Sequence, residues 1–299
     1  MSQTPRVPRF YINLMEYFKA TGQINVSNTV FNMNPSKRHD AFVNAQTLTI
    51  PRMLNDKAYV AYLGHEKGKM SIGHDITGDI AVNANLHSDS TTNLSPEYKG
   101  FSIASFDGTS SANLFVSTDN DIGSIVIGNY WEAPHSVDMS TTLGYSMDGV
   151  NNSQSKGGNT LSNANFLRTP DWWNGGAWQL TDSDIFDKMN LRNGRRSWSL
   201  SFSMLSEDNV FPKLAASTNL ESTYANTDDT ENTLYDSTDF FTQVWNRTLG
   251  SHLEFILQVD KDDFNPDSFA ICRFADNSLN VTQTSPLTYQ ISLKIVESW

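Results

Sequence analysis

A cluster of tryptophans provides the first residues whose chemistry could bind a ligand. Residues 169–178, TPDWWNGGAW, carry Trp172, Trp173 and Trp178 within ten positions. Flat indole rings can stack on sugar rings, and tryptophan is also enriched where domains or subunits meet. We favour an interface, because this segment would connect two sheets, and we keep a glycan-stacking site as the alternative.

Two adjacent arginines are the second candidate. Arg195 and Arg196 open the stretch RRSWSLSFSML (195–205) and could form a clamp for an anion. The following residues alternate between serine and a set of apolar side chains, namely Trp198, Leu200, Phe202 and Met204. This alternation is typical of a strand with one face in a core. We therefore expect the arginines to form ion pairs with carboxylates of the same or an adjacent copy, rather than to bind phosphate.

Motifs for a metal site are incomplete. His65-Glu66 begins like the helix of a zinc protease, but Lys69 occupies the position of the second histidine. Residues 119–123, DNDIG, have the first acidic spacing of a calcium loop without its later carboxylates, and a turn explains them more simply. The acidic stretch 227–239 is interpreted as a solvated loop. We expect no metal ligand.

Motifs for covalent or phosphate chemistry also fail. GYSMDG (144–149) has Asp148 where a nucleophile elbow needs its second glycine, which argues against Ser146 as a nucleophile. SKGGNT (155–160) lacks the Gly-Lys-Ser/Thr ending of a phosphate loop. Two glycosidase carboxylates need not be close in sequence, so a polysaccharide-degrading enzyme is a third hypothesis. We expect no enzyme, no catalytic residue and no cofactor.

Composition limits the partners of the chain. The net charge is −12 and the pI is near 4.8, which argues against nucleic acid or an anionic membrane surface as the main partner. The lone Cys272 allows no disulfide within the chain and lies among apolar neighbours, as a buried small hydrophobe would. The stretch MSQTPRVPRF has no signal pattern and no apolar run is long enough to span a membrane. We expect the chain to be made and folded in a cytoplasm, without membrane insertion.

The first half of the sequence reads as short strands between turns. The candidate strands are QTLTIP (46–51), AYVAYLG (58–64), DIAVNANLH (79–87), GFSIASF (100–106), ANLFVS (112–117) and GSIVIGNYW (123–131). This spacing is typical of a β-sandwich or jelly roll. Residues 10–22, FYINLMEYFKATG, are the best helix candidate, although a strand from Arg9 to Leu14 is an alternative.

The second half begins with a long polar hairpin or loop over residues 148–165. A short helix is expected at 240–245, and strands at 252–260, 268–274 and 287–299. The apolar face of the strand that begins at Arg195 is expected to pack beside the last strand, at Ile291, Leu293 and Ile295. The predicted fold class is therefore all-β, with two β-sandwich or jelly-roll-type domains and one or two short helices. The domains are expected at 1–130 and 131–299.

The order of motifs after residue 120 resembles a group of structural proteins of tailed bacteriophages. The motifs are IGNYWEAPHSVDMSTTLGYSMDG, SKGGNTLSNA, TPDWW, GRRSWSLSFSML, LEFILQVD, FAICRF and YQISLKIVESW, and they cover roughly residues 120–299. Their arrangement looks like the β-sandwich of distal-tail and tail-tube-like proteins. The first half is more distantly similar to galactose-binding-type jelly rolls.

This resemblance implies a non-enzymatic virion component of the tail or the tail–baseplate junction. Such a protein would assemble with copies of itself into a ring, expected to be hexameric, and would dock neighbouring tail proteins. The hairpin at 148–165 would then serve assembly or line a channel. The alternative function is a carbohydrate-binding or host-receptor-binding module, which would use the tryptophan cluster to bind a glycan.

Overall fold

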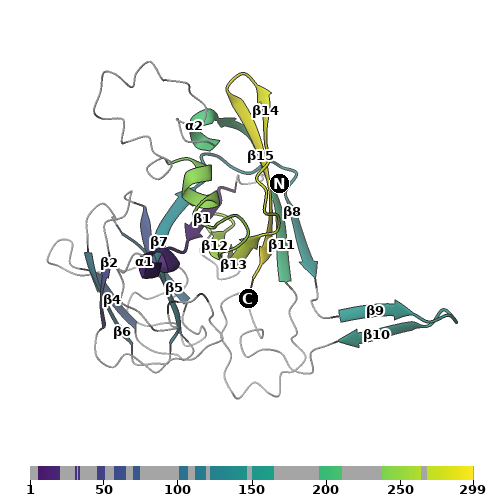
Figure 1. Cartoon of the computed structure of the whole chain (residues 1–299), viewed down its shortest axis with the longest axis horizontal. Helices are drawn as coiled ribbons and strands as arrows, with labels where there is room; N and C mark the ends of the chain where they lie inside the picture. The colour runs from purple at the N-terminus through teal and green to yellow at the C-terminus, as the bar shows by residue number, and fades with distance from the viewer. Residues whose placement is uncertain are drawn as a thin grey trace.

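A computed structural model describes the strands of the chain and several of their connections (Figure 1). The described residues are 6–20, 31, 33, 46–50, 57–64, 70–74, 101–106, 112–118, 122–146, 150–164, 195–210, 238–263 and 268–298. They are mostly antiparallel strands, which confirms the all-β class. Three short helices accompany them: α1 (Met15–Ala20), α2 (Glu207–Val210) and the π-helix η4 (Phe241–Trp245).

One sheet of ten strands dominates the fold. Its order is β5 (Phe101–Phe106), β3 (Ala58–Gly64), β7 (Ile122–Glu132), β1 (Arg9–Ile12), β12 (Phe255–Gln258), β13 (Phe269–Phe274), β15 (Thr288–Glu297), β11 (Arg195–Ser206) and β8 (Thr142–Ser146). β14 (Val281–Ser285) pairs with the first part of β15. Strands from both halves of the sequence therefore share one hydrogen-bonded sheet.

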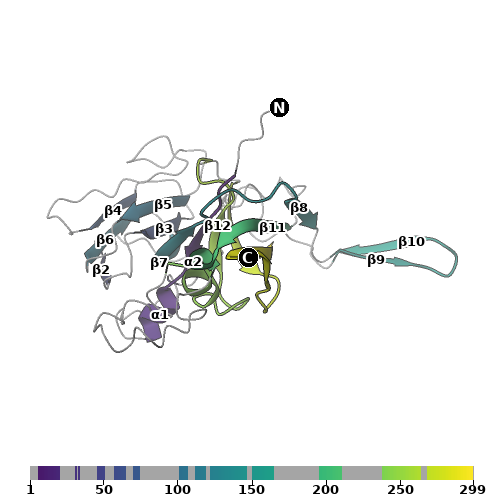
Figure 2. The ribbon, with the colours of Figure 1, turned by 90° about the horizontal axis from the view of Figure 1, so that it is seen from above.

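Two smaller sheets accompany the large one. β2 (Gln46–Ile50), β6 (Ala112–Thr118) and β4 (Met70–His74) form a three-stranded sheet in that order. It lies beside β5 in both views and beside β3 in Figure 2, which gives a β-sandwich-like arrangement (Figures 1 and 2). β9 (Val150–Gln154) and β10 (Thr160–Ala164) form a hairpin that projects away from the body of the molecule in both views.

The long strand β7 changes partner along its length. Residues 122–129 pair with β3, whereas Tyr130, Trp131 and Glu132 pair with β1. β1 in turn pairs with β12 on its other edge. The boundary expected after residue 130 coincides with this change of partner inside one continuous strand, and the division into two domains stays a prediction.

The centre of the large sheet is buried on both faces. On β1, Phe10 and Ile12 contribute to one apolar cluster, while Tyr11 contributes to a second cluster with Tyr59. β12 and β13 divide their side chains between the two clusters in the same way. Strands covered on both sides need apolar residues at successive positions, which explains the continuous runs FILQ and FAICRF.

Aromatic rings fill the larger cluster where η4 covers the sheet. The Phe10 ring lies 5.8 Å from the rings of Trp131 and Phe240 and 5.6 Å from that of Phe255. The indole Nε1 of Trp131 donates to the carbonyl oxygen of Thr238 at 3.1 Å, so its polar group is satisfied inside the core. The short helix expected at 240–245 is present as η4.

The predicted pairing of the arginine-led strand with the last strand is confirmed. Trp198 lies opposite Ile295, Leu200 opposite Leu293, and Phe202 opposite Ile291, and all six side chains are buried. The prediction was wrong for the fourth apolar residue, Met204, which is 80% exposed.

A β-bulge explains the error at Met204. The register of β11 on β15 shifts between Phe202 and Leu205, and Met204 has a φ of 63°. A bulge places an extra residue on one strand and reverses the alternation beyond it. Leu205 therefore takes the buried position, and the side chain of Met204 extends into solvent.

The helix expected over residues 10–22 forms only in part. Residues 9–12 are strand β1, which the alternative reading anticipated, and α1 occupies Met15–Ala20. The backbone N–H of Met15 donates to Oδ1 of Asn13 at 2.9 Å, so Asn13 caps the helix directly after the strand.

Gly128 allows β1 to cross β7 at very short range. A Cβ atom at this position would overlap the carbonyl oxygen of Ile12. The same carbonyl oxygen accepts a 3.1 Å hydrogen bond from the hydroxyl of Tyr59, and Leu14 N–H donates to the carbonyl oxygen of Ile127 at 3.1 Å. The junction between β1, β3 and β7 therefore requires a residue without a side chain.

Replacing Gly128 with alanine is expected to destabilise the fold by about 1–3 kcal/mol, because two backbone segments must separate. Urea denaturation followed by circular dichroism measures this loss. Gly157→Ala is the matched control, since the nearest atom to its added Cβ is Ser155 Oγ at 3.9 Å. Equal stability of the two variants would contradict the close approach.

Candidate functional site

The tryptophan cluster lies outside the part of the chain that the structure describes. Trp172, Trp173 and Trp178 therefore keep both interpretations, an interface or a glycan-stacking site, as predictions. His65 and Glu66 also lie outside it, as does most of the acidic stretch 227–239.

Arg196 makes an ion pair inside the chain. Its Nη2 lies 2.9 Å from Oε1 of Glu297, and its backbone N–H donates to Oε2 of the same carboxylate at 2.8 Å. Nη2 also donates to the carbonyl oxygen of Phe269 at 2.9 Å, and the guanidinium lies over the ring of Trp198. The side chain of Glu297 is only 3% exposed, so this pair joins β11, β13 and β15 in a nearly dry environment.

Arg195 is the first residue of β11 and lies opposite Ser146 of β8. Its side chain is partly buried, as is that of Arg196. The sequence predicts ion pairs of Arg195 and Arg196 with carboxylates of the same or an adjacent copy. Arg196 pairs with Glu297 of the same chain, and an ion pair of either arginine with an adjacent copy stays a prediction. Arg196 in addition has a structural role, because its guanidinium neutralises a buried carboxylate of the same chain.

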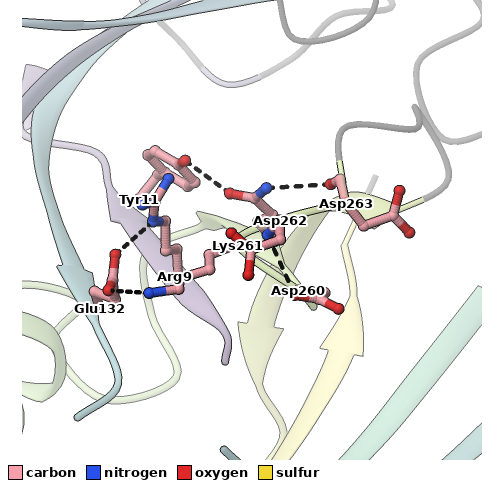
Figure 3. A network of polar contacts seen from close by, with 8 residues as sticks. Arg9, Tyr11, Glu132, Asp260, Lys261, Asp262 and Asp263 are labelled. Carbon is pink, nitrogen blue, oxygen red and sulfur yellow. Dashed lines mark hydrogen bonds and ion pairs between the residues drawn. The ribbon is translucent and has the colours of Figure 1, made fainter. Parts of the chain in front are cut away.

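A second polar network lies where β1, β7 and β12 meet (Figure 3). Glu132 accepts from Nε of Arg9 at 2.8 Å and from Nζ of Lys261 at 3.0 Å. The backbone N–H of Lys261 donates to the carbonyl oxygen of Val7 at 2.8 Å. One carboxylate thus connects the first strand, the strand that changes partner and the turn after β12.

Charge interactions shift the pKa values in this network. Burial is the largest single effect on Glu132 and raises its pKa, but the hydrogen bonds from Arg9 and Lys261 together lower the pKa below its ordinary value of 4.5. Burial is also the largest single effect on Arg9, where it lowers the pKa of the guanidinium. The interactions of Arg9 with Tyr11 and Glu132 outweigh burial and raise this pKa above its ordinary value. Both groups are therefore held in their charged forms at neutral pH.

The tyrosines beside this network are held in their neutral forms. The hydroxyl of Tyr11 donates to Oε1 of Gln258 at 2.9 Å, and Nε2 of Gln258 donates to the carbonyl oxygen of Asp263 at 3.2 Å. Burial raises the pKa of Tyr11 to about 12, and burial raises that of Tyr59 well above its usual range. Each hydroxyl donates a hydrogen bond inside the protein and is poorly suited to give up its proton.

The projecting hairpin β9–β10 is almost entirely exposed to solvent. Its side chains are exposed from Val150 to Asn163, apart from a partly buried Ser155. Among the residues with described positions, the two strands pair only with each other. We call residues 150–164 the arm.

The tip of the arm is a well-formed turn. Gly158 N–H donates to the carbonyl oxygen of Ser155, and Ser155 N–H to that of Asn159, both at 2.9 Å. Asn159 N–H also donates to Oγ of Ser155 at 3.0 Å, and Gly158 has a φ of 86° that favours glycine. The motif SKGGNT, which sequence analysis rejected as a phosphate loop, is this turn.

Strand β8 precedes the arm in the chain and is the last strand of the large sheet within the described residues. It pairs with β11, and its residues were not among the strands predicted from the sequence. Ser146 is the last residue of this strand, opposite Arg195. The segment before β8 is fastened to β11, because Oγ of Ser203 donates to Oδ1 of Asp138 at 2.6 Å and Asp138 N–H donates to the carbonyl oxygen of Ser201 at 2.8 Å.

In the described part of the chain, no group of three or more His, Cys, Asp or Glu side chains is arranged to hold a metal ion. No helix among these residues is long and apolar enough to cross a membrane. The candidate features of the described structure are therefore two internal charge networks, the exposed arm and the edge strand β8.

Replacing Arg196 with methionine is expected to cost about 3–5 kcal/mol of folding free energy, because Glu297 is left buried without its counter-ion. Chemical denaturation at neutral pH measures the loss. Lys19→Met is the control, since its partner Glu16 is 52% exposed and a helix pair of this kind is worth about 0.3–0.5 kcal/mol. A loss below about 1 kcal/mol for Arg196→Met would contradict a structural role.

Replacing Glu132 with glutamine is expected to cost about 1 kcal/mol at pH 7 and to make stability less sensitive to acid. The folded-state pKa of Glu132 is lowered, so its contribution is present above the ordinary value of 4.5 and is lost as the pH falls through the folded-state pKa. Thermal melts between pH 3 and pH 7 measure the difference between the two proteins. A difference that stays constant over this range would show that Glu132 is not the group responsible.

Comparison with known proteins gives no relative that assigns these features a role. No family model, no curated protein and no solved structure matches the chain. The internal networks, the arm and β8 are therefore interpreted from their own chemistry.

Proposed function

We propose that the chain is a non-enzymatic structural component of a bacteriophage virion, in the tail or at the tail–baseplate junction. In this proposal it assembles with copies of itself into a ring, expected to be hexameric, and docks neighbouring tail proteins. The observation that carries the proposal is the arm, an ordered hairpin that projects from the body and contributes nothing to its core.

The physical argument concerns the stability of the arm. An isolated two-stranded hairpin is at best marginally stable in water, and it gains stability when a further strand or a packed face supports it. Both faces of the arm are exposed, and most of its side chains are Asn, Ser, Gln and Thr. An element of this kind is suited to form its remaining contacts with another protein subunit.

The motif order supports the assignment to a virion. The resemblance to distal-tail and tail-tube-like proteins includes the SKGGNTLSNA segment, which forms the turn and second strand of the arm. Symmetric rings repeat one contact around an axis, so even a small contact made by an arm is multiplied by the number of subunits.

Native mass spectrometry and negative-stain electron microscopy of the purified chain test this proposal. The wild-type chain is expected to form a closed ring. A variant in which residues 150–164 are replaced by a short Gly-Ser linker is expected to be monomeric, with an unchanged melting temperature, because the arm does not pack on the core. A wild-type chain that stays monomeric at its highest soluble concentration would contradict self-assembly.

Gene order tests the assignment to a tail. Genes for tail proteins next to the gene of this chain would support the proposal. A neighbourhood of sugar-processing genes, together with glycan binding that Trp172→Ala or Trp173→Ala abolishes, would instead favour the carbohydrate-binding alternative.

A further inference from the structure

The geometry points to a specific receptor for the arm: we propose that the arm of one copy adds to strand β8 of a second copy. This inference rests on the proposed self-assembly and names the surface that performs it. It is carried by the exposed edge of β8, by the matching length and charge of the arm, and by the position of the two elements in the chain.

Among the described residues, β8 is an edge strand whose own sequence carries none of the side chains that usually block one. It is the last strand of the large sheet in the described structure, and its sequence TLGYS has no charged residue and no proline. Natural proteins commonly block such edges with lysine, proline or a bulge, because a regular unprotected edge is a template for another strand. An unprotected edge is therefore a candidate binding surface.

The apolar face of the sheet continues onto β8 and stays exposed there. Leu143 lies opposite the buried Trp198, and Tyr145 lies opposite Arg196, so both share the face of β11 that carries the larger cluster. They are nevertheless 62% and 56% exposed. A strand added beyond β8 would bring side chains next to both residues and continue the core outward.

The arm has suitable dimensions for this position. β8, β9 and β10 each contain five residues, so either strand of the arm can match β8 over its whole length. The arm also presents two exposed aliphatic side chains, Val150 on one face and Leu161 on the other. Either face can therefore place an apolar group near Leu143.

Charge favours a contact between these two surfaces. The chain carries a net charge of −12, so copies repel one another when their acidic surfaces meet. The arm contains no Asp or Glu and one positive residue, Lys156, at its tip, and β8 is uncharged. Pairing the arm with β8 brings two copies together through surfaces that do not repel.

The positions of β8 and the arm suit a contact that repeats from one subunit to the next. Only residues 147–149 separate β8 from β9, yet the arm projects away from β8 in both views (Figures 1 and 2). Each copy would then accept an arm on β8 and donate its own arm to the next copy. Such a head-to-tail contact closes into a ring when the rotation between copies divides the circle.

Mixing two assembly-deficient variants tests the inference. The edge variant carries Leu143→Lys and Tyr145→Lys, and the arm variant carries the linker in place of residues 150–164. Each variant alone is expected to be monomeric in sedimentation velocity. Their mixture is expected to give a one-to-one heterodimer and nothing larger, because the edge variant can only donate an arm and the arm variant can only accept one.

A control variant separates charge from position. Leu249→Lys with Leu287→Lys adds the same charge at residues that are 62% and 68% exposed elsewhere, and it is expected to assemble like the wild type. Hydrogen exchange of the wild-type chain adds an independent measurement: the backbone amides of β8 are expected to become protected in the assembly and to exchange faster in diluted monomers.

The outcomes distinguish this inference from the proposed function. If the wild-type chain is monomeric, the proposed self-assembly fails. If it forms rings and the edge variant forms the same rings, or if the β8 amides gain no protection, the proposed function stands and β8 is not the receptor.

Discussion

The fold depends on one short strand at the start of the chain. β1 (Arg9–Ile12) lies between β7 and β12 and joins strands that are otherwise separated by more than a hundred residues of sequence. It must be apolar on both faces, because Phe10 and Ile12 meet one cluster and Tyr11 meets the other. Without β1, the order of strands given above would break into two sheets.

Two consequences follow from this position of β1. The strand must pass β7 at contact distance, which excludes any side chain at Gly128. Its first residue, Arg9, needs a partner for its charge, which the carboxylate of Glu132 provides. The same carboxylate also pairs with Lys261. A packing requirement and an electrostatic requirement thus meet at the same junction.

The charged groups and the exposed groups have different roles in this molecule. Arg196 and Glu297 are largely hidden and stabilise the contact between β11, β13 and β15, although a pair of arginines in a sequence suggests a ligand site. The arm and β8 contribute little to the core, and their polar or apolar side chains remain in solvent. Elements that stay exposed to solvent are better candidates for contacts between subunits than side chains that are already buried in contacts with their own chain.

The sequence by itself determined features that depend on neighbouring residues. The alternation of serine with Trp198, Leu200 and Phe202 predicted a half-buried strand, and the SKGGNT segment was sufficient for a turn within a polar hairpin. Strand Ala58–Gly64 has the predicted bounds, and the strands predicted at 46–51 and 112–117 differ from the observed ones by one residue at one end. These predictions succeed because side-chain period and turn chemistry act over a few residues.

Only the tertiary structure decided which distant segments meet. It divided residues 9–20 between a strand and a helix, exposed Met204 at a bulge, and made β8 from residues that resembled an incomplete catalytic motif. It also selected Glu297, 101 residues away, as the partner of Arg196. Local patterns do not encode these outcomes, because each depends on the burial and charge that a side chain meets after the strands have assembled.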